Sequence, residues 1–218
     1  MPVEIVNVAI VVLIENHIPG VVHPLFLTEH GIAPREWKLK GDLICTPPVS
    51  KVGYDSGLQI TAEMGKLTVH DTLQERTPEG AIAPAFVAEY LRTLPQLKCK
   101  AVGVNFLCFL PEDDPSKYLL SKYVKTGTWN DDQTKPESAV LNLNYRCEGF
   151  TAGFRIDVGS KKSPGGTDEV AGVVFNANYN ELIREVMDNS STRLAIQAVE
   201  RYGERLAQFR EMAPRILE

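Results

Sequence analysis

Asparagine recurs at every second position in two segments that otherwise resemble β-strands. Asn142 and Asn144 alternate with apolar and aromatic residues, as do Asn176, Asn178 and Asn180. Asparagine is depleted in strands, and alternate residues of a strand share one face of a sheet. Each carboxamide offers both a donor and an acceptor. The rows predict a hydrogen-bonding surface for a polar ligand or a partner protein. The alternative is a solvated sheet face, with Asn180 capping a short helical turn.

Further ligand-binding candidates are the adjacent residues His70 and Asp71, at the end of a predicted strand, and Trp129, in a polar loop. A tryptophan in such a loop can cover a ligand pocket or an interface, or fold back over its own core. A zinc site would need further ligands beside His70 and Asp71. His23 and His30 stand about two helical turns apart, too far to share one ion. We predict no metal site and no cofactor.

Signatures of catalysis are missing from the chain, which contains no Gly-x-Gly-x-x-Gly, phosphate loop, Gly-x-Ser-x-Gly or His-Glu-x-x-His. The neighbouring carboxylates Asp113 and Asp114 do not fix the geometry that acid–base catalysis needs, and Asp114 suits a helix N-cap. We therefore assign no catalytic residue and leave open whether the protein is an enzyme. The cysteines form no Cys-x-x-Cys pair, and we interpret all of them as reduced core thiols; they are Cys45, Cys99, Cys108 and Cys147.

Charge and hydropathy narrow the range of partners. The 218 residues include 23 basic and 28 acidic side chains, a net charge of −5, so the chain is acidic. Tight binding to a phosphate backbone depends on clustered Lys and Arg, so we do not expect nucleic acid as a partner. No apolar stretch approaches the roughly 20 residues that cross a bilayer, and no secretory signal is evident. We expect a soluble cytoplasmic protein that does not enter a membrane.

The predicted elements follow the same order twice. Residues 3–14 form an apolar strand that we expect to be central and buried on both faces. A short helix from Pro19 to about His30 follows, then strands, and then a helix after Pro84. Among these strands, 57–62 and 66–71 alternate between apolar and polar residues and are predicted to form a hairpin. The second series runs from a strand at 100–110 to a long C-terminal helix. The elements of this second series are a strand at 100–110, a helix from Asp114 to about 124, strands at 139–147, 150–158 and 170–179, and a helix from 190 or 191 to about 212.

We predict an α+β fold in which a mostly antiparallel sheet is packed by helices. The halves 1–95 and 96–218 are each predicted to have the element order β-α-β-β-β-α. We expect the two halves to be fused in one compact unit. Two such pseudo-repeats can join their sheets in one curved sheet and remove exposed edges. The order resembles the duplicated unit of the TATA-box-binding-protein-like fold, but that resemblance is one of topology and carries no function. A ferredoxin-like α+β sandwich is the alternative.

Two functions remain open from the sequence. The first is a non-enzymatic binding or assembly protein that acts through a sheet face or the C-terminal helix, with a homo-oligomer or a partner protein. The second is an enzyme or carrier for a small polar ligand, bound between the sheet and the helices. In that case the same candidates would line the site, namely His70, Asp71, Asn142, Asn144, Asn176 and Asn178.

Overall fold

The computed structural model describes residues 4–128, 134–162, 169–184 and 190–217. Nine strands and their connecting helices make up this part of the chain. The strands are β1 (Glu4–Ile14), β2 (Ile44–Cys45), β3 (Val49–Gly53), β4 (Leu58–Glu63), β5 (Lys66–Asp71), β6 (Cys99–Pro111), β7 (Leu141–Arg146), β8 (Thr151–Lys162) and β9 (Glu169–Leu182). The helices are η1 (Pro19–Val21), α1 (Pro24–Glu29), η2 (Pro78–Gly80), α2 (Ala83–Thr93), α3 (Pro115–Tyr123), α4 (Ser191–Glu200) and α5 (Tyr202–Leu217).

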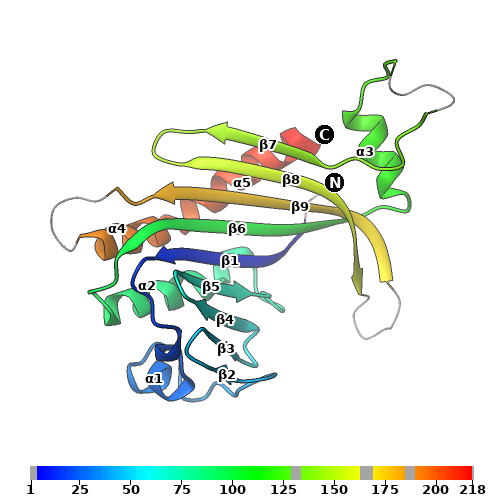
Figure 1. Ribbon diagram of the computed structural model, residues 1–218. Coiled ribbons are helices and arrows are strands. Elements are labelled where there is room, and N and C mark those ends of the chain that lie inside the picture. Colours follow the sequence, from blue (N-terminus) through cyan, green and yellow to red (C-terminus); the bar gives the residue numbers. More distant parts are fainter. Residues whose placement is uncertain (1–3, 129–133, 163–168, 185–189, 218) are drawn as a thin grey trace.

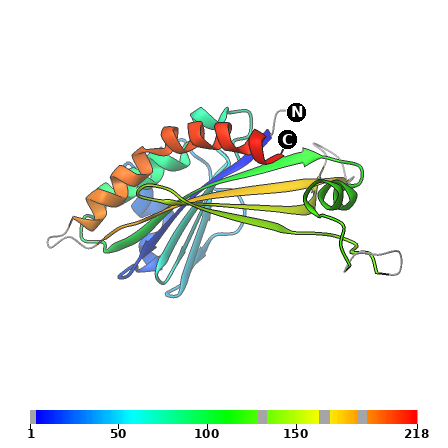
Figure 2. The ribbon, with the colours of Figure 1, turned by 90° about the horizontal axis from the view of Figure 1, so that it is seen from above.

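All nine strands form one sheet in the order β2-β3-β4-β5-β1-β6-β9-β8-β7 (Figure 1). Every pairing is antiparallel. The long strands β1 and β6 lie side by side near the middle, and each half of the chain continues outward from its own first strand. Helices α2, α4 and α5 lie on one side of this sheet (Figure 2). The fold class is therefore the predicted one, an α+β fold with a large antiparallel sheet packed by helices.

The core lies between the sheet and these helices. Phe106 of β6 contacts the rings of Tyr179 in β9 and of Phe209 in α5, with centroids 5.9 and 5.1 Å apart. Leu206, one turn before Phe209, is 3% exposed, so the apolar stripe of the C-terminal helix packs on the sheet. Large buried side chains alternate along the strands because only one face meets the helices.

The prediction for the first strand is half wrong. It is central, but it is not buried on both faces: Val8, Ile10 and Val12 are fully buried against the helices, whereas Leu13 on the opposite face is 43% exposed. The apolar run concealed this difference because β-branched residues occupy both faces. Similarly, Cys99 and Cys108 are buried, but Cys45 is exposed and Cys147 half-buried, so not every cysteine is a core thiol.

The helices predicted after Pro84 and Asp114 begin within about one residue of the expected positions, as α2 and α3. The predicted helix from Pro19 to about His30 is instead divided into η1 and α1, and α1 begins only at Pro24. Asp114 caps α3 by accepting a hydrogen bond from the Lys117 backbone N–H at 2.9 Å. The last helix differs in its extent. The predicted single C-terminal helix is divided at Arg201 into α4 and α5, and α5 continues through Pro214 to Leu217. No helix in the described part of the chain is long and apolar enough to cross a membrane.

Candidate functional site

The side of the sheet opposite the helices carries most of the asparagines. A row of directly opposed residues crosses four neighbouring strands. Asn105 of β6 lies opposite Asn178 of β9, and Asn178 lies opposite Gly153 of β8. Gly153 lies opposite Asn144 of β7. These side chains share one face because residues directly opposite each other in a sheet point to the same side. Seven of the ten asparagines lie there, and we call them the amide face: Asn7, Asn105, Asn142, Asn144, Asn176, Asn178 and Asn180. In Figure 1 this face is turned toward the viewer, and no helix of the described part of the chain crosses it.

The centre of the amide face is held by a hydrogen bond between side chains. The Asn178 amide Nδ2 donates to Asn105 Oδ1 at 2.6 Å, and Asn105 Nδ2 donates to the carbonyl of Ala9 at 3.4 Å. Glycine at two neighbouring positions leaves room for these carboxamides. A Cβ at Gly103 would come within 3.4 Å of Asn178 Nδ2, and one at Gly153 within 3.2 Å of Asn144 Oδ1.

Three other amides of this face are open to solvent. Asn142, Asn144 and Asn176 are exposed, and no side-chain hydrogen bond joins them to another described residue. The four asparagine candidates from the sequence thus lie on one surface, as their alternation predicts. Asn180 does not cap a helical turn; it belongs to β9 and faces the same side. The sequence reasoning missed Asn7 and Asn105, whose only signal was a polar residue within an otherwise apolar strand.

The other predicted candidates do not join this surface as a group. His70 is on the same side as the amides, where its Nδ1 lies 3.4 Å from Asn7 Oδ1, and burial lowers its pKa. Asp71, the next residue, points to the opposite side and is fully buried. Adjacent strand residues face opposite sides, so His70 and Asp71 cannot bind one ligand together. Trp129 lies outside the described residues.

The buried carboxylate of Asp71 stabilises the local fold. Its Oδ1 accepts from the backbone N–H of Leu73 at 2.9 Å and pairs with the Arg76 guanidinium at 2.5 Å. Its Oδ2 accepts from the N–H groups of Ile82 and Ala83 at 2.6 and 3.3 Å. The carboxylate thereby ties the end of β5 to the start of α2, and its oxygens are already engaged.

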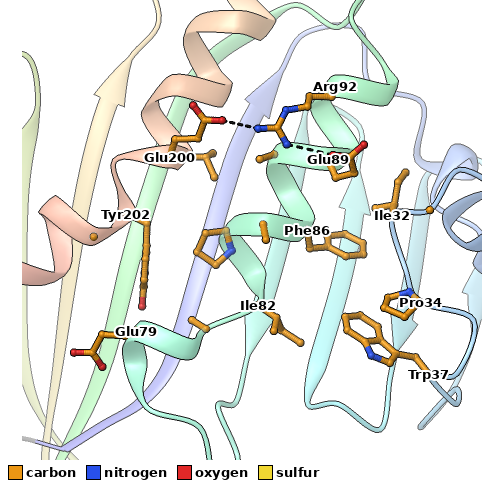
Figure 3. A pocket seen from close by; sticks show the side chains of 17 residues that line it. Ile32, Pro34, Trp37, Glu79, Ile82, Phe86, Glu89, Arg92, Glu200 and Tyr202 are labelled. Atoms are coloured by element: carbon orange, nitrogen blue, oxygen red, sulfur yellow. Dashed lines mark hydrogen bonds and ion pairs between the residues drawn. The ribbon is translucent and has the colours of Figure 1, made fainter.

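A hollow of about 650 Å³ opens on the helix side of the molecule. Figure 3 shows Phe86 of α2 and Ile82, the residue before α2, on its floor, with Trp37 at one end and Tyr202 at the other. None of the amide-face asparagines lines it. The asparagine candidates and His70 therefore cannot form a site between the sheet and the helices, because their side chains leave the sheet in the other direction. Asp71 points toward the helices, but it does not line the hollow.

The charged groups around this hollow are already paired. Arg92 bridges Glu89 at 3.2 Å and Glu200 at 2.5 Å, and Glu79 pairs with Arg210. The hydrogen bond from Arg210 holds the pKa of Glu79 below its usual value. The lining of the hollow thus offers apolar contact and paired charges, with one net negative charge because Arg92 is shared by Glu89 and Glu200. It offers no unpaired acid or base at a perturbed pKa.

Comparison with known proteins gives no information about the function. No protein-family model matches the chain, and no similar curated protein or solved structure was found. Within the described ranges, no cluster of three or more His, Cys, Asp or Glu side chains could hold a metal ion. The function must therefore be argued from the geometry of the amide face and of the hollow.

Proposed function

We propose that this protein is a non-enzymatic binding protein whose amide face binds a partner protein. The observation that supports this most directly is the gathering of seven asparagines on the face that no helix covers. Carboxamides bind polar groups without the cost of removing a charge from water. A row of donors and acceptors that extends over several strands suits a macromolecular surface better than a small ligand, which needs a concave site.

The charges on this face disfavour nucleic acid. Two cations of this face are paired with carboxylates: Arg155, opposite Asn176, with Asp157 at 2.6 Å, and Lys66 with Glu63 at the same distance. Arg146 and Lys51, on the same side, form no ion pair with another described residue, but they lie on separate strands and do not form a cluster. Cations already paired with carboxylates attract phosphates weakly. Depletion of free charge is instead typical of the central part of protein interfaces.

One end of the face is apolar, which also favours a protein partner. Leu13 of β1 and Leu182 of β9 both lie opposite Ala101 of β6, one on each side, and they are 43% and 69% exposed. Exposed apolar groups beside polar ones are typical of protein interaction sites. The expected partner therefore presents hydrogen-bonding groups toward the amides and an apolar side chain toward this end.

The test is site-specific photo-crosslinking in the expression host. A photoreactive amino acid replaces Asn176, which is exposed on the amide face, or Gln197, which is exposed on α4 on the other side. We expect a discrete crosslinked protein from position 176 and none at that mass from position 197. A second substitution, Leu13→Glu, should reduce the yield at position 176 because it places a charge at the apolar end.

Three outcomes would contradict the proposal. The first is the absence of any crosslinked protein at position 176. The second is the same product at positions 176 and 197, since a specific surface cannot lie on both sides of the sheet. The third is a nuclease-sensitive product whose yield falls steeply with salt, which would indicate a phosphate backbone as the partner.

The second candidate function is a carrier for a small molecule, and the hollow of about 650 Å³ favours it, since ligand pockets have volumes of roughly 300–1,000 Å³. Its floor at Phe86 and Ile82 is apolar, so the ligand would be largely apolar rather than polar. Native mass spectrometry of freshly purified protein separates the two candidates. A retained small molecule that is lost in Ala88→Trp, which fills the hollow, would favour the carrier.

We also infer that residues 1–95 and 96–218 are structural pseudo-repeats arranged as in the TATA-box-binding-protein-like fold. Adjacent β1 and β6, with each half continuing outward to its own edge, support this arrangement. A difference between the halves is the extra short strand β2 in the first. This arrangement implies only that one face of the sheet is left uncovered by helices. It does not indicate what that face binds, because topology alone carries no binding chemistry.

A further inference from the structure

The two edges of the sheet differ in how well they are protected from pairing with another strand. At one edge, β2 has two residues, and Pro47 and Pro48 follow it. Short strands and prolines are common means of preventing edge-to-edge association. At the other edge, β7 has six residues, contains no proline, and carries one charge, at Arg146. No strand of the described part of the chain pairs with its outer side.

The backbone groups on the outer side of β7 can be assigned from the hairpin. The Cys147 N–H donates to the Phe150 carbonyl at 3.0 Å, so residue 147 faces β8. Backbone direction alternates along an antiparallel strand. The N–H and C=O groups of Asn142, Asn144 and Arg146 therefore point outward. The side chains of the same residues lie on the amide face.

This edge is complementary to itself. In an antiparallel pair of two β7 strands, Asn144 can lie opposite its own copy, with Asn142 opposite Arg146. Arg146 then meets a carboxamide instead of another cation, and the amides continue across the seam. Cross-strand pairs of this kind stabilise a sheet, whereas like charges directly opposite destabilise it.

A cleft beside this edge provides the apolar area that strand pairing alone lacks. It has a volume of about 720 Å³ and lies between the β7–β8 turn and α5. Tyr145, Phe150, Met212 and Ile216 supply its apolar lining, and Glu148, Gln208, Glu211 and Arg215 also line it. Tyr145 is 38% exposed at its mouth. Stable interfaces bury roughly 1,200–2,000 Å², more than one short strand pair supplies. A two-fold axis through β7 brings the C-terminal turns of both α5 helices to the seam.

We propose that two copies of this chain associate through their β7 strands, which pair antiparallel and join the two sheets into one continuous sheet. The amide faces of both copies then lie on the same side, and the clefts beside α5 close against each other. This association uses the sheet edge and does not depend on what the amide face binds.

The test compares the mass in solution of the native chain with that of two variants. By sedimentation equilibrium, the native chain should have twice its mass of 24.2 kDa. Asn144→Pro removes only an outward N–H and fits an edge strand, so it should leave the fold intact and give the monomer mass. Asn176→Pro is not a suitable control, because β9 lies inside the sheet; Asn176→Ala, on the same face, should stay dimeric.

A crosslink tests the register independently of folding. Cα atoms of opposed hydrogen-bonded residues lie about 5.5 Å apart, within the range that a disulfide spans. Under mild oxidation, Asn144→Cys should therefore form a covalent dimer well above the background of the native cysteines. The matched control, Asn176→Cys, should remain at that background.

A native chain that is monomeric at its highest soluble concentration would overturn the proposal, even if β7 accepts a strand from a different protein. A dimer that persists in Asn144→Pro, without crosslinking through position 144, would place the interface elsewhere and overturn it equally. If circular dichroism shows that Asn144→Pro is unfolded, the comparison of the cysteine variants decides.

Discussion

Replacing Asp71 with alanine should destabilise the fold more than the loss of any exposed carboxylate. The side chain is fully buried and binds four groups: the N–H groups of Leu73, Ile82 and Ala83, and the Arg76 guanidinium. It also holds a turn in an unfavourable conformation. Leu73 and the following residue, Gln74, have φ values of 56° and 53°, a region that non-glycine residues rarely occupy.

The magnitude follows from these contacts. Breaking a buried ion pair by removing one partner costs about 3–5 kcal/mol, because the other charge is left without compensation. The Arg76 side chain is 27% exposed, so water can hydrate its guanidinium once the carboxylate is removed. This hydration reduces the cost and favours the lower end of the range. Each buried N–H left without an acceptor adds roughly 1–3 kcal/mol if water cannot reach it. These costs do not add in full, because the turn can relax and expose the N–H groups to water. We therefore expect Asp71→Ala to lower the free energy of unfolding by about 3–5 kcal/mol.

The assay is urea unfolding followed by circular dichroism, with the native chain and Asp55→Ala as references. Asp55 is also a carboxylate that accepts a backbone N–H, from Lys38 at 3.1 Å, but it is exposed. Its loss should cost less than about 1–2 kcal/mol, the value of an ordinary cap. A cost for Asp71→Ala no greater than that of Asp55→Ala would refute the reasoning, because burial would then not determine the value of the contacts.

Three further predictions concern packing and protonation. Leu206→Ala should lower the free energy of unfolding by roughly 2–5 kcal/mol, as buried leucine truncations do, whereas Glu204→Ala on the exposed side of α5 should change it little. Gly172→Ala should destabilise the fold, because its Cβ would come within 2.5 Å of a backbone oxygen, whereas Gly203→Ala should stabilise the protein by about 0.5–1 kcal/mol, both measured by urea unfolding. Burial lowers the pKa of His17, so the unfolded chain takes up more protons below about pH 6.5 and stability falls as the pH drops. Urea midpoints at two pH values on either side of 6.5 should therefore differ less in His17→Gln than in the native chain.

Much of the fold was accessible from local patterns. The β4–β5 hairpin was predicted from the alternation of its residues, and α3 from Asp114 followed by a proline. These features depend on neighbouring residues, so a sequence window contains their cause. The division of the C-terminal helix at Arg201 was missed because its apolar stripe continues with the same period on both sides of the break.

The candidate site was predicted only in part, for the same physical reason. Alternation is local, so the sequence alone determined that Asn142 shares a face with Asn144, and Asn176 with Asn178. Which strands lie next to each other depends on pairing between distant residues. The tertiary structure decided that Asn178 lies beside Asn105, 73 residues earlier, and that the helices cover the opposite face. His70 and Asp71 face opposite sides because they are neighbours in a strand, which local alternation already implies. The tertiary structure decided that His70 turns toward the amide face and Asp71 toward the helices.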